Sequence, residues 1–138
     1  MKRILCGIWL LSLLPGSLRA ETVESADVRV LAKTGSSWDG NPLPAYAQGT
    51  PEVTVLRITI PPGGQLPPHK HVVMNAGVLL RGELTVVTEE NKTLHLKAGE
   101  SIVEVVNTWH YGKNEGTTPA EIIVIYAGVQ GQPITVTK

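Results

Sequence analysis

Residues 63–82 read GGQLPPHKHVVMNAGVLLRG, and this stretch decides how the rest of the chain is interpreted. It places His69 and His71 one residue apart in a segment with the composition of a β-strand. Alternate side chains of a strand point to the same face, so both imidazoles are expected to face the same way. A third histidine, His110, lies in a second such segment, residues 99–114 (GESIVEVVNTWHYGKN). Because imidazole is a common ligand of transition metals, three histidines that meet on one inner wall predict a metal site.

From residue 53 onward the sequence has the pattern of an all-β protein. Short runs rich in Val, Ile, Leu and Thr are separated by Gly, Pro and Asn turns, and no segment repeats apolar residues at a helical spacing. Many short strands at this spacing favour a sandwich or barrel in a single domain. The expected strands are 53–60, 69–74, 76–80, 83–88, 93–97, 101–106, 120–127 and 134–136.

Residues 1–20 are expected to be a secretory signal peptide that is removed. A short basic start precedes an apolar run at residues 4–14, and Ala20 supplies a small residue at the expected cleavage site. A membrane anchor is the weaker alternative, because a spanning helix needs about 20 apolar residues. The sequence therefore predicts export, to the periplasm or otherwise into the medium. Residues 21–52 are then an N-terminal arm and loop, and residues 53–138 are the barrel.

The composition excludes several partners and chemistries. Three of the 12 basic residues lie in the signal segment, which leaves 9 basic against 12 acidic residues in the mature chain. No run of Lys and Arg is present, so neither nucleic acid nor an anionic membrane is an expected partner, and stable membrane insertion is not expected. The single cysteine, Cys6, leaves with the signal, so thiol chemistry is not expected. No nucleophile elbow, phosphate-binding loop or dinucleotide fingerprint appears either.

The first histidine segment resembles the first sequence motif of the cupin family. Gly63, His69, His71 and Gly82 have the spacing of that motif, and Asn75 stands where the family usually has glutamate. The resemblance implies a jelly-roll barrel, the double-stranded β-helix, with a metal near its wider opening. It says much less about activity, because one fold hosts many functions.

The second segment resembles the second cupin motif. Gly99, His110 and Asn114 fit its spacing, while Val105 replaces the usual proline and Asn107 the usual glycine. The two motifs and the residues between them cover a little under half of the mature chain. The resemblance also implies a homodimer.

The three histidines are expected to bind one divalent transition metal: Fe, Zn, Ni, Cu or Mn. Asparagine is a neutral amide and a weak ligand, so Asn75 is expected to hydrogen-bond beside the metal or to orient a substrate. A three-histidine site keeps the full charge of the dication, which favours an anionic or enolate-like ligand. Some cupin dioxygenases use three histidines, and this pattern resembles theirs. The alternative is that glutamate and metal were lost together, which leaves a barrel with polar residues inside.

Three further residues are interpreted from strand alternation. Gly77 is expected to share the inward face with Asn75, where it either leaves room for a pocket or accommodates a bend. Tyr126 lies on a late strand and is either a phenol acid near the metal or a packed ring. His95 alternates with two leucines and is expected on the surface.

The acids and aromatic residues near the motifs are expected to be structural. Glu83 and Glu104 are the nearest acids, and either would be a general base if it faced the metal. Both are expected to be solvated strand residues. Trp109 and Tyr111 flank His110 and should point away from it. A strand at residues 28–32 would add to the edge of a neighbouring sheet in the dimer.

Two classes of function remain. The preferred one is an exported metalloenzyme of the dioxygenase type, which acts on a small anionic organic molecule. The alternative is a non-catalytic module in which the same barrel holds a metal or a small ligand. The lack of an evident general acid or base weakens the case for an enzyme, whereas the three histidines weaken the case for a purely structural role.

Overall fold

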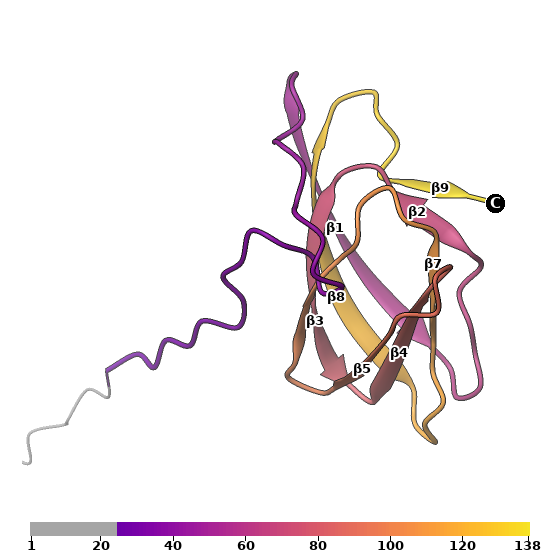
Figure 1. Ribbon diagram of the computed structural model, residues 1–138. Helices are drawn as coiled ribbons and strands as arrows, with labels where there is room; N and C mark the ends of the chain where they lie inside the picture. Colours follow the sequence, from indigo (N-terminus) through magenta and orange to yellow (C-terminus); the bar gives the residue numbers. More distant parts are fainter. Residues whose placement is uncertain (1–24) are drawn as a thin grey trace, which may run out of the picture.

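The computed structural model describes residues 25–138, and this part of the chain contains nine β-strands and no helix (Figure 1). The all-β prediction is therefore confirmed. The predicted signal segment, residues 1–20, lies outside the described residues. The strands are β1 (Pro51–Ile60), β2 (His69–His71), β3 (Met74–Arg81), β4 (Glu83–Thr88), β5 (Thr93–Lys97), β6 (Ser101–Val103), β7 (His110–Lys113), β8 (Ala120–Val129) and β9 (Thr135–Thr137).

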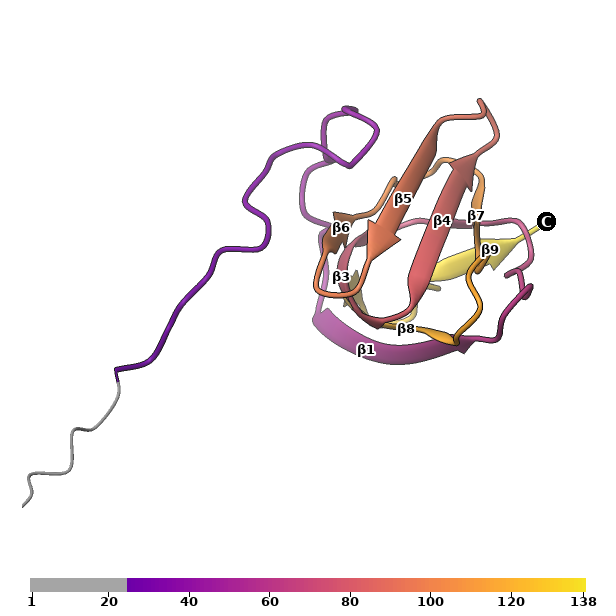
Figure 2. The same cartoon turned by 90° about the horizontal axis from the view of Figure 1, so that it is seen from below.

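The strands form two antiparallel sheets that face each other and close into a jelly-roll barrel (Figure 2). One sheet has the order β1-β8-β3-β6 and the other the order β5-β4-β7-β2-β9. Apolar side chains from both sheets fill the space between them, among them Leu79, Val86, Ile102 and Ile122. A bridge between His71 and Val106 and a backbone hydrogen bond of 2.7 Å from Asn107 to His71 connect β2 to the loop before β7.

Strand β3 shows the alternation that the sequence predicts. Asn75, Gly77 and Leu79 are buried, whereas Ala76 and Leu80 are exposed on the opposite face. Strand β3 also pairs with β8 and β6, so it lies inside its sheet. The inward positions of β3 therefore face the barrel interior, as expected for a period of two.

Several predicted strands differ from the structure. The predicted strand 69–74 ends at His71, the predicted strand 101–106 ends at Val103, and β7 was not predicted. Strand β1 begins at Pro51, where composition placed the end of the loop, because Pro51 and Glu52 pair with the last residues of the long strand β8. No strand forms at residues 28–32, where Val28 and Val30 are 84% and 75% exposed. Apolar composition alone does not make a strand there, because no neighbouring strand takes up its backbone hydrogen bonds.

The loop before His110 explains one departure from the second motif. Asn107 stands where glycine is usual, and its φ angle is 58°. This left-handed conformation suits glycine and is tolerated by asparagine better than by most residues. The substitution therefore keeps the turn that delivers His110 to the barrel interior.

Asn114 closes the other end of β7. It is 1% exposed, its amide nitrogen donates to Ile60 O (3.0 Å) and Thr118 O (2.8 Å), and its side-chain oxygen accepts from Gly116 N (2.9 Å). A buried amide with three hydrogen bonds ties the end of β7 to β1. Within residues 25–138, no helix is long and apolar enough to cross a membrane.

Candidate metal centre

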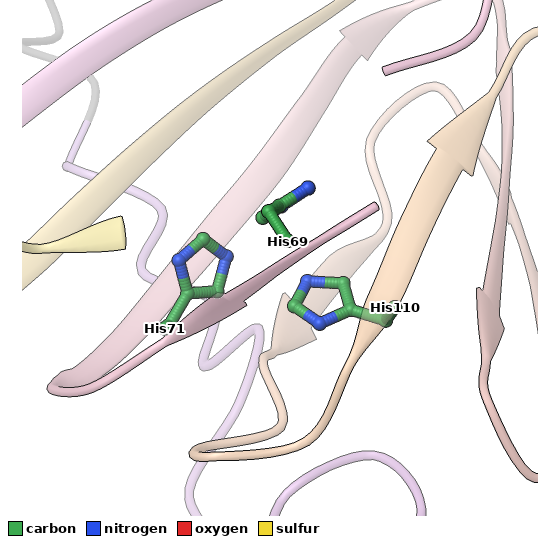
Figure 3. A group of neighbouring side chains, drawn as sticks. All are labelled: His69, His71 and His110. Atoms are coloured by element: carbon green, nitrogen blue, oxygen red, sulfur yellow. The ribbon is translucent and has the colours of Figure 1, made fainter. Parts of the chain in front are cut away.

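The three predicted histidines meet inside the barrel (Figure 3). His69 and His71 come from β2, His110 is the first residue of β7, and His69 pairs directly with His110 across the two strands. The ring centroids are 4.5 to 5.0 Å apart, and all three side chains are buried. One ring nitrogen from each lies within 4.8 Å of the other two. The sequence prediction that these side chains share one wall is confirmed.

Backbone carbonyls fix the orientation of two rings. His69 Nδ1 lies 2.8 Å from Pro67 O, and His110 Nδ1 lies 2.9 Å from Thr108 O. A carbonyl oxygen only accepts a hydrogen bond, so both Nδ1 atoms carry the hydrogen. In the neutral rings this leaves Nε2 with its lone pair, which is the form that binds a metal.

The third ring has a similar support. His71 Nδ1 lies 3.0 Å from Thr135 Oγ1 on β9, a hydroxyl that can accept its hydrogen. The C-terminal strand therefore contributes to the site by holding His71. His110 Nε2 is buried and has no hydrogen-bond partner among the described residues. A buried acceptor without a partner fits a position that a metal ion fills.

The distances fit one ion. Nitrogen atoms that each lie about 2.0–2.1 Å from a metal are up to about 4 Å apart, so the observed cluster needs only small adjustments. Burial lowers the pKa of His71 to about 3, with smaller contributions from His110 and His69, and it lowers the pKa of His110 to about 4. Both rings therefore stay neutral well below neutral pH, which is the state that a ligand requires.

The structure corrects the interpretation of Glu104. It was expected to be solvated, but it is 7% exposed, and its Oε2 lies 3.7 Å from His110 Nε2. Burial raises the pKa of this carboxyl to about 7. One signal in the sequence could have found it: Ile102 is an inward core residue, and Glu104 follows it by two.

Tyr126 also reaches the site. It is 3% exposed, and its ring centroid lies 5.3 Å from that of His71. Burial, and secondarily the nearby carboxylate of Glu104, raises the pKa of the phenol to about 12. Tyr126 therefore keeps its hydrogen and is a donor rather than a base.

Asn75 and Gly77 are buried in β3, but neither lines the histidine cavity. Both side-chain amide atoms of Asn75 lack hydrogen-bond partners among the described residues. Gly77 does not open a pocket, because a Cβ there would lie 2.9 Å from Ile123 O. Its role is close packing of β3 on β8, and the space that the sequence suggested beside the metal is already filled.

The remaining candidates lie outside the site, as predicted. His95 is exposed, and its Nδ1 lies 3.0 Å from Thr85 Oγ1. Glu83 is exposed at the start of β4. Trp109 turns away from the histidines, and the amino groups of Lys70 and Lys138 each lie 5.2 Å from its ring centroid.

The space between the histidines is small. Its volume is about 40 Å³, and its polar lining consists of the three histidines, Glu104 and Tyr126. The rest of the wall is apolar and includes Leu66, Val86 and Ile122. This interior therefore has room only for an ion and small ligands.

Metal-free protein is expected to lose stability as the pH falls from about 6.5 to about 4. Over this range the unfolded chain protonates histidines that titrate near 6.5, while His71 and His110 in the folded chain stay neutral. Glu104 acts in the opposite direction between its unfolded value of 4.5 and about 7, because only the folded chain keeps that proton. Two histidines outweigh one carboxyl, so the net effect of acid is destabilising.

Urea unfolding in a chelator at several pH values measures this slope. Glu104→Gln removes the opposing contribution and should steepen the loss. Stability that is flat or rises on acidification would show that the histidines are not buried as neutral groups.

Comparison with known proteins shows to which family the chain belongs. The family model for the cupin domain matches residues 56–126, just over half of the chain. The chain therefore belongs to the cupin family. Germin-like protein subfamily 2 member 2 of Arabidopsis thaliana is 39% identical over 79 residues, which are 54% of this chain and 36% of that protein. The chain thus matches little more than a third of that relative's length.

Solved structures agree on the fold. A structure of oxalate oxidase in complex with the substrate analogue glycolate has a TM-score of 0.54 and 30% identity, over 62% of this chain and 45% of that chain. An uncharacterised protein with a double-stranded β-helix domain from Klebsiella pneumoniae has a TM-score of 0.56 and 16% identity, over 82% of this chain and 97% of that chain. The second likeness concerns the fold alone.

Proposed function

We propose that this protein is a mononuclear metal-dependent oxidoreductase of the dioxygenase type, which acts on a small anionic organic molecule. The observation that carries the proposal is the orientation of the histidines. The Nδ1 atoms of His69 and His110 are held by backbone carbonyls, so their Nε2 atoms are free for a metal in a buried cavity. A divalent ion bound there supplies Lewis-acid polarisation of substrate oxygens and, as iron, reactivity toward dioxygen.

The size and charge of the site support a small anion as substrate. A cavity of about 40 Å³ has no room for a large ligand beside an ion. Three neutral imidazoles leave the charge of a dication uncompensated, which favours an anionic ligand. The oxalate oxidase structure holds glycolate as a substrate analogue, and glycolate is a small carboxylate.

The protein's own groups would position such a substrate. Tyr126 is a neutral phenol beside His71, so it can donate a hydrogen bond to a substrate oxygen. Asn75 has a buried amide without hydrogen-bond partners among the described residues, but it lies outside the lining of the histidine cavity. The apolar wall keeps bulk water away, which strengthens these interactions.

Oxygen consumption tests the enzyme proposal. The protein is loaded separately with Fe²⁺, Mn²⁺, Ni²⁺, Cu²⁺ and Zn²⁺ and then mixed with a panel of small carboxylates, diketones, thiols and phenols. We expect at least one redox-active metal to support oxygen uptake with an anionic member of the panel, and Tyr126→Phe to reduce it. If the protein binds metal but turns over no member of the panel, the enzyme proposal is contradicted and a non-catalytic binding module remains.

The alternative is a non-catalytic module that binds metal or a small ligand. The small volume of the cavity favours it, since it leaves little room for a reacting pair. Calorimetric titration of the metal-loaded protein with glycolate and similar anions separates binding from turnover.

We also propose that the signal segment directs export. N-terminal sequencing of the secreted protein would test this.

We propose in addition that the protein forms a homodimer. The outer face of the β1-β8-β3-β6 sheet supports the dimer. Val53, Val55, Leu80 and Ile125 there are 47% to 68% exposed. Such a patch is a common interface. Light scattering should give twice the chain mass, and a monomer at micromolar concentration would contradict the dimer.

A further inference from the structure

Glu104 and His110 form a pair of buried acceptors that face each other. Glu104 Oε2 and His110 Nε2 are 3.7 Å apart, both are buried, and neither has a hydrogen-bond partner among the described residues. A distance of 3.7 Å is too long for a hydrogen bond. His110 carries its hydrogen on Nδ1, so its Nε2 presents a lone pair to the carboxylate. A cation between them would satisfy both atoms.

The spacing of these atoms fits a shared ion. Two atoms that each bind a metal at about 2.0–2.2 Å lie about 3–4 Å apart. Glu104 also lines the same cavity as His69 and His71. All four side chains therefore surround one small space.

The backbone shows why the acid comes from this position. Ala76 in β3 pairs with Val103 in β6, and Glu104 N donates to Asn75 O at 3.1 Å, so Glu104 lies across from Asn75. Side chains directly across antiparallel strands have Cβ atoms about 4.5–5.5 Å apart. Glu104 therefore approaches the barrel interior from beside Asn75, which has only a neutral amide to offer.

We propose that Glu104 is the fourth protein ligand of the metal held by His69, His71 and His110. The site is then a three-histidine, one-carboxylate set whose acid belongs to the segment after β6. The inference rests on the proposed metal site and makes it more specific.

The assignment has consequences for the metal and for the substrate. One carboxylate reduces the net charge of a bound dication to +1, which still attracts an anion. A six-coordinate ion keeps two positions free, and they suffice for the two oxygens of a small carboxylate. A four-coordinate Zn²⁺ ion would have no free position. The site therefore suits ions that accept six ligands, such as Mn²⁺ and Fe²⁺.

Titration calorimetry with Mn²⁺ tests the ligand role in the parent, in Glu104→Gln and in the control Glu83→Gln, which changes an exposed acid on β4. Glutamine has the same size and removes a buried charge, so the metal-free variant should fold at least as stably as the parent. We expect Glu104→Gln to weaken Mn²⁺ binding by at least about tenfold, because changes next to metal ligands already cost about 10–100-fold. Glu83→Gln should leave the affinity unchanged. A loss below tenfold in Glu104→Gln overturns the proposal.

A second measurement uses the unaltered side chain. In protein labelled with ¹³C-glutamate, the Mn²⁺ electron–nuclear double-resonance spectrum should show a carboxylate carbon coupled to the ion. The coupling should vanish in Glu104→Gln. A parent that binds Mn²⁺ without this coupling overturns the ligand assignment alone, whereas a parent that binds no metal overturns the proposed function itself.

Discussion

Alanine in place of His69, His71 or His110 is expected to weaken metal binding by more than about 100-fold, because each change removes a ligand and not merely a neighbour of one. The three rings lie around one cavity, and each has an oxygen partner on Nδ1 that orients it. Removing one ring takes away one nitrogen ligand, so the ligands that remain hold an ion much more weakly in competition with water. Calorimetric titration of each variant with a divalent transition metal measures the loss.

His95→Ala is the matched control. His95 is exposed on β5, where it hydrogen-bonds to Thr85, and it does not line the cavity. Its removal should leave metal affinity within about twofold, although it takes away the same chemical group. Three cavity variants that bind metal as tightly as His95→Ala would show that the histidine cluster is structural.

Gly82→Ala is expected to cost at least about 2 kcal/mol of the free energy of unfolding. Gly82 joins β3 to β4 with a φ angle of 74°, a conformation that costs about 1–2 kcal/mol for a residue with a Cβ. The added Cβ would also lie 2.5 Å from Pro119 O and 2.9 Å from Ala120 Cα. These are backbone atoms at the start of β8, so the sheet itself has to move.

Gly99→Ala separates the two causes of that loss. Gly99 has a φ angle of 90°, but a Cβ there meets nothing within 4 Å. It therefore carries the conformational cost without the steric one. Urea unfolding should show Gly82→Ala to be clearly more destabilising than Gly99→Ala, and equal losses would mean that the close approach of β8 is unimportant.

The strands and the three histidines were predictable because both follow from a period of two. Runs of Val and Ile between turns predicted the barrel, and the His-x-His spacing predicted two side chains on one face. The third histidine needed the resemblance of the second motif, since no local rule says which distant strand lies beside β2. The structure supplies that link through the pairing of His69 with His110.

Glu104 was misjudged, and Gly77 was left undecided, for a different reason. The side of a strand on which a residue lies depends on register, and β6 ends one residue before Glu104. Composition favoured a solvated acid, whereas continuation of the inward face from Ile102 buries it. For Gly77, only the packed structure shows that β8 already fills the space a side chain would take.

Metal content shows directly whether this barrel is a mononuclear metal site. The protein is stripped with a chelator, incubated in turn with Fe²⁺, Zn²⁺, Ni²⁺, Cu²⁺ and Mn²⁺, passed through a desalting column and subjected to elemental analysis. We expect about one metal ion per chain with at least one of these ions, and loss of that ion in His110→Ala. A protein that stays metal-free with all five ions would contradict the metal site.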